Sequence, residues 1–342
     1  MPRRHRLVPK VIAFAATAAV LIVLGATPAA RAETKEVRIA QQFGVNYLPL
    51  TVMRKLKLVE RKTAEMGLGE VSVTWLQFGA GSGMNDALLS RSLDFASGGV
   101  GPLLTIWDKT RGTIDVKGVA SLGSMPLYLT TTNPAVKSVR DFTEKDKIAL
   151  PAVKVSIQAV VLQMAAAQAF GEENYTRLDS LTVSMKHPDA LTALLSGGTE
   201  INAHFGNAPF QEQELQDPTV RRVLSSYDVV GASTLNSLYT TARFRNENFK
   251  TYLAVVAALK EAVRIINQDK KAAAQLYVEE EKSKLSPDFV LKILSDPDFI
   301  VTTTPQGIMK YANFMVGTKS LKNRPNGWKD VYFPDIHDEP GN

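Results

Sequence analysis

Short strands that end in glycine turns constrain this chain of 342 residues more than any other feature of its sequence. Over residues 71–78 apolar and polar residues alternate, which predicts a β-strand, and Gly79-Ala80-Gly81-Ser82-Gly83 then breaks the pattern. A short helix and a buried strand, Leu93–Ala96, are expected next. The pair Gly98-Gly99 is expected to turn the chain into a second helix over Pro102–Trp107.

This alternation of strands and helices favours a parallel sheet whose strand ends carry glycine turns into one shared crevice. Helices that begin at such turns present free backbone N–H groups and a partial positive charge. A small anion or another polar ligand is the kind of molecule that this geometry suits.

The first 32 residues have the pattern of a secretory signal peptide. Basic residues up to Lys10 precede an apolar run over 11–24, and small residues around Ala30 and Ala32 allow cleavage before Glu33. The run is short for a membrane span of about 20 residues. With no Cys in the chain, a lipoprotein signal is excluded. We expect a cleaved, exported protein, with a retained N-terminal anchor as the alternative.

The formal charge of the whole chain is +6, and residues 1–32 carry five basic and no acidic residues, so only +1 remains after cleavage. This balance gives no reason to expect binding to nucleic acid or to a membrane surface. Hydrophobic residues make up 45% and charged residues 22%, as in a soluble globular protein long enough for two domains. The absence of Cys also excludes disulfides and thiol ligands.

The remaining sequence indicates two series of strands and helices. Further strands are expected at 36–40, 116–122, 127–131, 147–150, 181–184 and 200–203, and extended pieces at 220–230 and 233–241. Helices are expected at 49–60, 159–170, 188–195, 249–281, 287–294 and 305–316. Ser156 is expected to cap the helix that Gly171 stops. The aromatic tail, 323–342, is expected to pack on the surface of a lobe.

Two similar lobes are favoured by a faint internal repeat. Residues 86–96 and 189–203 both run from a helix with an early acidic residue into a strand that follows an acid. Each repeat then ends in a turn, at residues 97–99 in one and 204–207 in the other. Such units also resemble one another by physics alone, which is the alternative explanation.

Several segments together resemble the nitrate/sulfonate/taurine class of solute-binding proteins. They are the export signal, Gln42-Phe43-Gly44 after the first strand, FGAGSGMNDALLSRSLDFASGGVGP from Phe78, and LPAVKVSIQAVVLQMAA from Leu150. The resemblance covers residues 35–335. It implies an α/β fold of two lobes, each a parallel-rich sheet flanked by helices, joined by two crossing strands. The lobes would be 33–127 with 233–342, and 128–232.

The resemblance also implies a ligand in the cleft between the lobes, held by turns from both. The expected ligand-binding residues are Gln42, Phe43, Tyr47, Ser82, Gly83, Gly98, Gly99, Ser124 and Met125 from the first lobe, and Val155, Ser156, Ile157, His187, His204, Phe205 and Asn207 from the second. Relatives often carry an aromatic-acid-proline triplet where this chain has His204-Phe205-Gly206, so the identity of the ligand stays open.

Each of these residues also has a purely structural interpretation. Ser82 and Ser156 fit as helix caps, which stabilise a helix by about 1 kcal/mol without any ligand. Phe43, Tyr47 and Phe205 fit as core residues. If the aromatic rings line the cleft, they favour an organic ligand with a flat or apolar part. An imidazole in the cleft would bond a carboxylate or sulfonate and make binding sensitive to pH.

Signatures of enzymes are missing from the sequence. The turn before Met84 is neither a nucleophile elbow nor a dinucleotide fingerprint, because Ala80 and Met84 stand where glycines are needed. The histidines after residue 32 lack the spacing of metal ligands, and no phosphate-binding loop is present. A related enzymatic branch makes thiamine pyrimidine with a cysteine-rich motif, which this chain lacks. We therefore expect no catalytic residues, cofactor or metal.

The favoured hypothesis is a monomeric periplasmic protein that captures a small organic anion, such as a sulfonate or aromatic carboxylate. It would deliver the anion to an ABC importer, meaning a permease and its ATPase in the inner membrane. Two alternatives remain at this stage. One is binding of a pyrimidine-like heterocycle, and the other is a ligand-sensing protein that regulates a membrane partner.

Overall fold

The computed structural model describes residues 1–2 and 33–342, and residues 33–342 form one compact unit. The expected signal peptide, apart from its first two residues, lies outside the described residues. Among the residues described, none of the helices combines the length and the apolar character that crossing a membrane requires.

The first of two sheets in the described chain, which we name the β1 sheet, has the strand order β2-β1-β3-β10-β4. Its strands are β1 (Glu36–Gln41), β2 (Ser72–Gln77), β3 (Phe95–Gly99), β4 (Val116–Ser124) and β10 (Thr234–Thr241). β1 pairs in parallel with β2 and β3, whereas β10 is antiparallel to both β3 and β4. The sheet is therefore mixed, because β10 arrives from the other half of the molecule.

The second sheet, the β6 sheet, has the order β7-β6-β8-β5-β9. Its strands are β5 (Tyr128–Thr131), β6 (Ile148–Leu150), β7 (Thr182–Ser184), β8 (Ala203–Phe205) and β9 (Arg221–Ser225). β6 is parallel to β7 and β8, while β5 is antiparallel to β8 and β9. The two sheets share one plan, since each has a parallel core and an antiparallel strand next to a crossing.

The chain crosses between the sheets at two places along the described residues. The first crossing runs from β4 through residues 125–127 into β5, as an extended segment. The second runs from β9 through helix α8 (Ser226–Val230) into β10. The prediction of extended structure to residue 230 was wrong, because Ser225 and Asp228 form a capping box that starts a helix. The lobe boundaries at 127/128 and 232/233 stay a prediction.

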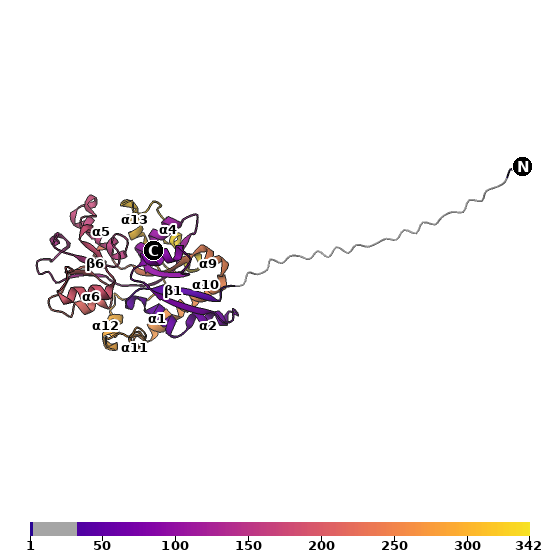
Figure 1. Ribbon diagram of the computed structural model, residues 1–342, viewed down its shortest axis with the longest axis horizontal. Helices are drawn as coiled ribbons and strands as arrows, with labels where there is room; N and C mark the ends of the chain where they lie inside the picture. The colour runs from indigo at the N-terminus through magenta and orange to yellow at the C-terminus, as the bar shows by residue number, and fades with distance from the viewer. Residues whose placement is uncertain (3–32) are drawn as a thin grey trace. The chain divides into compact units, whose positions relative to one another are not determined.

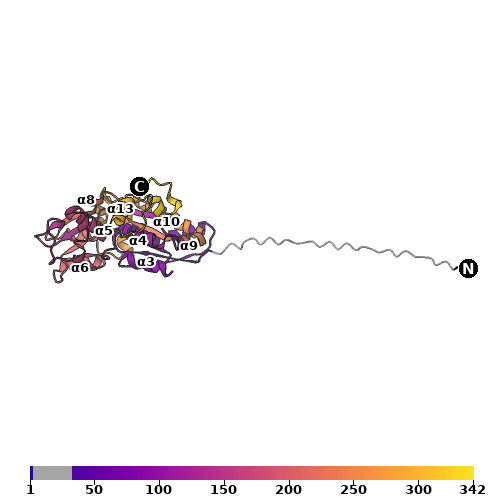
Figure 2. The same cartoon turned by 90° about the horizontal axis from the view of Figure 1, so that it is seen from above.

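Helices cover the sheets (Figures 1 and 2). Around the β1 sheet the helices are η1 (Val45–Tyr47), α1 (Leu48–Lys55), α2 (Leu58–Glu65), α3 (Gly81–Leu89), α4 (Val100–Thr110), α9 (Ala242–Glu247), α10 (Phe249–Gln268), α11 (Lys270–Glu280), α12 (Pro287–Ser295), α13 (Ile308–Gly317), α14 (Trp328–Val331) and η5 (Pro334–Ile336). Around the β6 sheet they are η2 (Val139–Asp141), α5 (Ile157–Phe170), η3 (Glu172–Asn174), η4 (Asp179–Leu181), α6 (His187–Ser196) and α7 (Phe210–Glu214). In Figure 1, α5 and α6 lie on opposite sides of β6.

The glycine-rich stretch folds as strand, helix, strand, helix, as predicted, with one correction. Gly98 and Gly99 belong to β3 and pair with Ser237 and Asn236 of β10. They were predicted as a turn, but the antiparallel partner supplies hydrogen bonds that keep the glycines in the sheet. Helix α4 then begins directly at Val100.

Two predicted helices are each divided. The helix expected over 49–60 breaks into α1 and α2 at Lys57, whose φ of 49° is left-handed. The helix expected over 249–281 breaks at Asp269, whose side chain accepts a hydrogen bond from Ala272 N and caps α11. In both cases a local change at one residue divides a continuous apolar pattern into two shorter helices.

The C-terminal tail packs against the β1 sheet through its aromatic residues, as predicted, and these residues reach into the core. Tyr332 is fully buried, and its ring fills the space over Gly118 of β4. A Cβ on Gly118 would lie 2.3 Å from that ring, so only glycine permits this contact. Trp328, Val331 and Ile336 are also buried.

Candidate functional site

A cavity of about 20 Å³ lies between the β1 sheet and the β6 sheet. It is lined by Gln42, Asn46, Tyr47, Gly81, Gly99, Pro102, Leu235 and Asn236 on one side, and by Pro151, Ser156, Ile157, Gln158, His187 and Asn207 on the other. We call the space that these residues line the cleft. The space is enough for about one water molecule, so an organic ligand needs the two sides to move apart.

The cavity is small because the two sides touch. Val45 N donates to Ala208 O at 2.9 Å. Asn207 Nδ2 donates to Asn46 Oδ1 at 2.9 Å and to Phe43 O at 3.2 Å. These bonds join the segment after β1 to the segment after β8 and hold the cleft closed.

Four helices of the described chain begin at the cleft. Gly81 is the first residue of α3, Gly99 is the N-cap of α4, Ser156 is the N-cap of α5 and His187 is the first residue of α6. All four residues line the cavity. Each helix start contributes backbone N–H groups without a partner in the helix and a partial positive charge. Their convergence creates an environment that favours a negative charge.

Ser156 caps α5 as the sequence predicted. Its Oγ accepts a hydrogen bond from Ala159 N at 3.2 Å. The other predicted cap differs, because α3 begins at Gly81 with Ala80 as N-cap, and Ser82 is its second residue. Gly81 packs closely on its neighbour, since a Cβ there would lie 3.1 Å from the Pro102 ring.

Amide side chains line both sides of the cleft, and two of their atoms lack partners. Asn236 Nδ2 and Asn207 Oδ1 are buried without a hydrogen bond in the described structure. Both residues are more than 95% buried. Because an unsatisfied buried polar atom costs about 1–3 kcal/mol, these two atoms mark positions where a ligand or water would bind.

Tyr47 is held as a neutral phenol at the floor of the cleft. Its Oη accepts a hydrogen bond from Gln42 Nε2 at 2.8 Å. Burial raises the pKa of Tyr47 well above its usual range, and Tyr239 adds to the rise. The hydroxyl therefore keeps its proton at neutral pH and remains a donor.

A chain of buried hydrogen bonds leads from the cleft into the β6 sheet. Gln158 Nε2 lies 3.2 Å from His187 Nε2, and His187 Nδ1 lies 2.8 Å from His204 Nε2. His204 Nδ1 bonds Glu214 Oε1, and Thr130 Oγ1 donates to Glu214 Oε2 at 2.6 Å. We call Gln158, His187, His204 and Glu214 the histidine relay.

The carboxylate of Glu214 sets the tautomers along the histidine relay. A carboxylate only accepts, so His204 Nδ1 carries a hydrogen and, in a neutral ring, His204 Nε2 accepts from His187 Nδ1. His187 Nε2 then accepts from the Gln158 amide. Burial, with His204 adding to the effect, holds the pKa of His187 well below its usual range. His187 is thus a neutral ring whose two nitrogens are both engaged.

Seven of the predicted ligand-binding residues line the cavity. They are Gln42, Tyr47, Gly99, Ser156, Ile157, His187 and Asn207. Phe43 contributes a carbonyl to the contact across the cleft. Ser82 and Gly83 lie in the first turn of α3, Gly98 lies in β3 beside Tyr239, and Val155 lies in the turn before α5.

The other predicted residues lie in the sheets or at the crossing. His204 and Phe205 are fully buried inside β8, which begins at Ala203, the residue where the predicted strand ended. Ser124 Oγ donates to Ser233 O at 2.6 Å where the chain crosses between the sheets. Met125 lines a larger pocket beside this crossing.

Sequence reasoning missed half of the residues that line the cavity. These are Asn46, Gly81, Pro102, Pro151, Gln158, Leu235 and Asn236. Gly81 lay within the glycine turn already singled out, and Pro151 and Gln158 flank the predicted cap Ser156. Leu235 and Asn236 carried no local signal, because only the return of β10 into the β1 sheet brings them to the cleft. Among the described residues, acidic, His and Cys side chains do not gather into a group that could hold a metal ion.

Comparison with known proteins identifies the fold. No family model and no curated protein matches the sequence. The alkanesulfonate-binding protein of Xanthomonas axonopodis pv. citri, solved with MOPS bound, is similar in structure, with a TM-score of 0.69 and 19% identity over 86% of this chain and 96% of that one. The periplasmic aliphatic sulphonate-binding protein of Escherichia coli has a TM-score of 0.63 and 18% identity, over 88% of this chain and 92% of that one. The periplasmic nitrate-binding protein of Synechocystis PCC 6803 has a TM-score of 0.59 and 14% identity, over 76% of this chain and 70% of that one.

These similarities show that the chain has the periplasmic-binding-protein fold, with two mixed sheets flanked by helices. The resemblance seen in the sequence is confirmed at the level of the fold. The neighbouring structures are solute-binding proteins. At identities below 20% in these three comparisons, the ligand has to be argued from the residues of this chain.

Proposed function

We propose that this chain is a periplasmic solute-binding protein of the nitrate/sulfonate/taurine class, which captures a small organic anion in the cleft. It then delivers the anion to an ABC importer, acting as a monomer after removal of its signal peptide. The observation that carries the proposal is the convergence of the starts of α3, α4, α5 and α6 on one cavity. No acidic side chain lines this cavity among the described residues, so nothing there opposes a negative charge.

Binding requires opening of the closed cleft. The contacts between Val45 and Ala208 and around Asn207 are single hydrogen bonds, each worth about 1 kcal/mol. Rotation about the two crossings would separate the sides, and a bound anion would replace these contacts with bonds to both sides. The orphaned Asn236 Nδ2 is positioned to donate to such an anion.

A pyrimidine-like heterocycle is the second candidate, and one observation favours it. Five amide side chains line the cleft: Gln42, Asn46, Gln158, Asn207 and Asn236. Amides present donors and acceptors side by side, which matches the edge of a heterocycle that carries both.

The experiment is thermal unfolding of residues 33–342, refolded to remove bound ligand, against sulfonates, carboxylates, nitrate and pyrimidines. A ligand at 100 times its Kd adds about 2.7 kcal/mol, which raises Tm by about 4 °C for a protein of this size. A shift with anions and none with pyrimidines is the expected result. A shift with pyrimidines alone would replace the first candidate by the second.

Asn236→Asp tests whether the cleft is the site of binding. The new carboxylate faces the helix starts and repels an anion, so the Tm shift should disappear while the fold is kept. Gln275→Glu on α11 is the matched control, because it adds the same charge at an exposed position. If neither substitution alters the shift, the anion binds outside the cleft. If no compound gives a shift and calorimetry is also silent, the proposal fails.

A further inference from the structure

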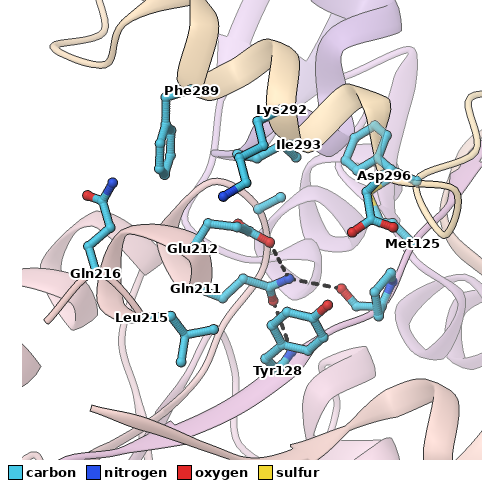
Figure 3. Close-up of a pocket in the computed structure, with 13 residues that line it drawn as sticks. Met125, Tyr128, Gln211, Glu212, Leu215, Gln216, Phe289, Lys292, Ile293 and Asp296 are labelled. Carbon is cyan, nitrogen blue, oxygen red and sulfur yellow. Dashed lines mark hydrogen bonds between the residues drawn. The ribbon is translucent and has the colours of Figure 1, made fainter. Parts of the chain in front are cut away.

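A pocket of about 310 Å³ lies beside the first crossing and apart from the cleft (Figure 3). It opens between α7 and α12, and the segment from Met125 to Tyr128 forms one of its walls. The pocket meets the cleft only through the neighbours Asn207 and Ala208, which line one site each. Its volume is at the lower end of the range for small-molecule sites.

Glu212 brings an unpaired carboxylate oxygen into this pocket. Its Oε1 accepts a hydrogen bond from Gln211 Nε2 at 2.9 Å. The Gln211 side chain is fixed in turn, because it accepts from Tyr128 N at 2.9 Å and donates to Pro126 O at 3.2 Å. Glu212 Oε2 is buried and has no hydrogen-bond partner in the described structure.

Lys292 brings an unpaired ammonium to the rim of the same pocket. It projects from α12 towards Glu212 in Figure 3. Nevertheless, none of the described residues forms a hydrogen bond or ion pair with its Nζ, and Glu212 lies beyond ion-pair distance. The pocket therefore contains a carboxylate, Glu212, and an ammonium, Lys292, that face one another without forming an ion pair.

The other walls of this pocket are largely apolar. Met125, Leu215, Phe289, Ile293 and Phe299 line it together with the ring of Tyr128. Asp296, at the end of α12, adds a second carboxylate, although its Oδ1 already accepts from Asp298 N at 2.9 Å. An acid and a base in one pocket whose other walls are largely apolar match a molecule with an amine, an acid and an apolar body.

We propose that this pocket binds a small zwitterion of the class of apolar α-amino acids, with its ammonium at Glu212 Oε2 and its carboxylate at Lys292. The ligand would complete the hydrogen bonding of Glu212, which the chain itself leaves unsatisfied. The residues that line this site are different from those that line the proposed anion site in the cleft. Because α7 belongs to the β6 sheet side and α12 to the β1 sheet side, the occupant would touch both.

The ionisation of Glu212 should couple to binding. Burial raises the pKa of Glu212 to about 7, with Glu214 and Asp296 adding to the rise against the hydrogen bond from Gln211. An ammonium at Oε2 favours the ionised carboxylate, so affinity should fall as the pH drops below 7. The other titratable and charged groups around Glu212 are Glu214, Asp296, Lys292, Tyr128 and Arg222, whose guanidinium lies 4.8 Å from the Tyr128 ring.

The test uses phenylalanine as the probe, titrated into residues 33–342 by calorimetry at pH 8. Phenethylamine lacks the carboxylate and hydrocinnamate lacks the amine, so each should bind at least tenfold more weakly. Glu212→Gln keeps the shape of the side chain, and Lys292→Gln changes an exposed residue. Each substitution should weaken phenylalanine binding at least tenfold, whereas Glu200→Gln, an exposed control with the same charge change as Glu212→Gln, should not.

Asn236→Asp distinguishes this pocket from the cleft. Phenylalanine binding that survives Asn236→Asp and is lost in Glu212→Gln supports the proposal, whatever the outcome of the anion panel. The reverse pattern would place the amino acid in the cleft and overturn it. Phenethylamine binding as tight as phenylalanine binding would also overturn it, because Lys292 would then have no role. No binding of phenylalanine to the unaltered chain would exclude the site.

Discussion

At the scale of single residues, burial decides which polar groups are available to a ligand. His204 was predicted to contact the ligand, but its ring lies inside β8 between His187 and Glu214. His187 reaches the cleft with both nitrogens engaged. The side-chain groups left free are the Tyr47 hydroxyl hydrogen and amides, and Asn236 Nδ2 is the clearest of the amides. Specificity in this cleft is therefore expected to come from amides and backbone N–H groups, and not from a charged imidazole.

Glu214→Ala should destabilise the protein by about 3–5 kcal/mol, because it removes one partner from a fully buried polar chain. His204 Nδ1 and Thr130 Oγ1 would both lose their acceptor. Urea unfolding monitored by circular dichroism measures the change. Glu200→Ala, at an exposed position, should stay within about 0.5 kcal/mol. A loss below 1 kcal/mol for Glu214→Ala would show that the histidine relay does not support the fold.

Glu212 should make stability fall as the pH rises from 5 to 8. Its pKa of about 7 in the folded protein lies above its ordinary value of 4.5, so the folded state binds more protons than the unfolded state in this window. The stabilisation is complete below the unfolded pKa and is lost through pH 7. An effect on the order of 2 kcal/mol follows from the shift and the partial exposure of the side chain.

Glu212→Gln provides the measurement for this pH effect. The substitution should flatten the decline in the free energy of unfolding between pH 5 and 8, and should stabilise the protein at pH 8. An unchanged slope would mean that another group titrates there.

At the scale of elements, the cleft is built from ends of helices and strands. Four helices of the described chain, α3, α4, α5 and α6, contribute their first residues or their N-caps, and the two parallel cores aim these ends at the same space. Close approach then depends on small residues. Gly99, at the end of β3, lies against Ile157 at the start of α5.

Gly99→Ala should prevent the cleft from closing. Its Cβ would lie 2.7 Å from both Cβ and Cγ2 of Ile157, and the φ of Gly99, −58°, is accessible to alanine. The fold should survive, whereas the radius of gyration from X-ray scattering should rise and ligand affinity should fall at least tenfold. Gly198→Ala is the control, because nothing lies near its added Cβ.

Adding Ile157→Gly to Gly99→Ala should restore closure, since it removes both atoms that clash. If the single Gly99→Ala variant binds ligand as tightly as the unaltered protein, contact between β3 and α5 is not required for binding.

At the scale of the whole molecule, one hydrophobic cluster connects the two sheets. It contains Ile39 of β1 together with Leu129 of β5 and Ile148 of β6. A smaller cluster around Ala149, Ala190 and Ile201 lies on the far side of the β6 sheet. Apolar packing therefore continues from one sheet to the other across the crossings.

Residues 33–342 should therefore unfold in one transition. Differential scanning calorimetry should give equal calorimetric and van't Hoff enthalpies, and a saturating ligand should move the whole transition to a higher temperature. Two resolved transitions, or a ligand that moves only part of the heat capacity peak, would show that the sheets fold independently.

Local pattern determined much of this protein without help from the structure. Period-two alternation and glycine turns predicted β2, α3 and α4, and the cap at Ser156 and the stop at Gly171 predicted the ends of α5. These features depend on neighbours in the chain, which a sequence displays directly. The resemblance to a known family, and not local pattern, supplied the sixteen predicted site residues, of which seven line the cavity.

Tertiary structure decided the contacts between residues that are far apart in the sequence. The pairing of β10 with β3 kept Gly98 in a strand and brought Asn236 to the cleft. The packing of Tyr332 over Gly118 drew the tail into the core. Each of these contacts is between residues more than a hundred positions apart in the sequence. Burial of both partners holds each contact in place. Composition and periodicity describe one segment at a time. They therefore predicted the helices and strands, but they could not predict which distant side chains would become partners.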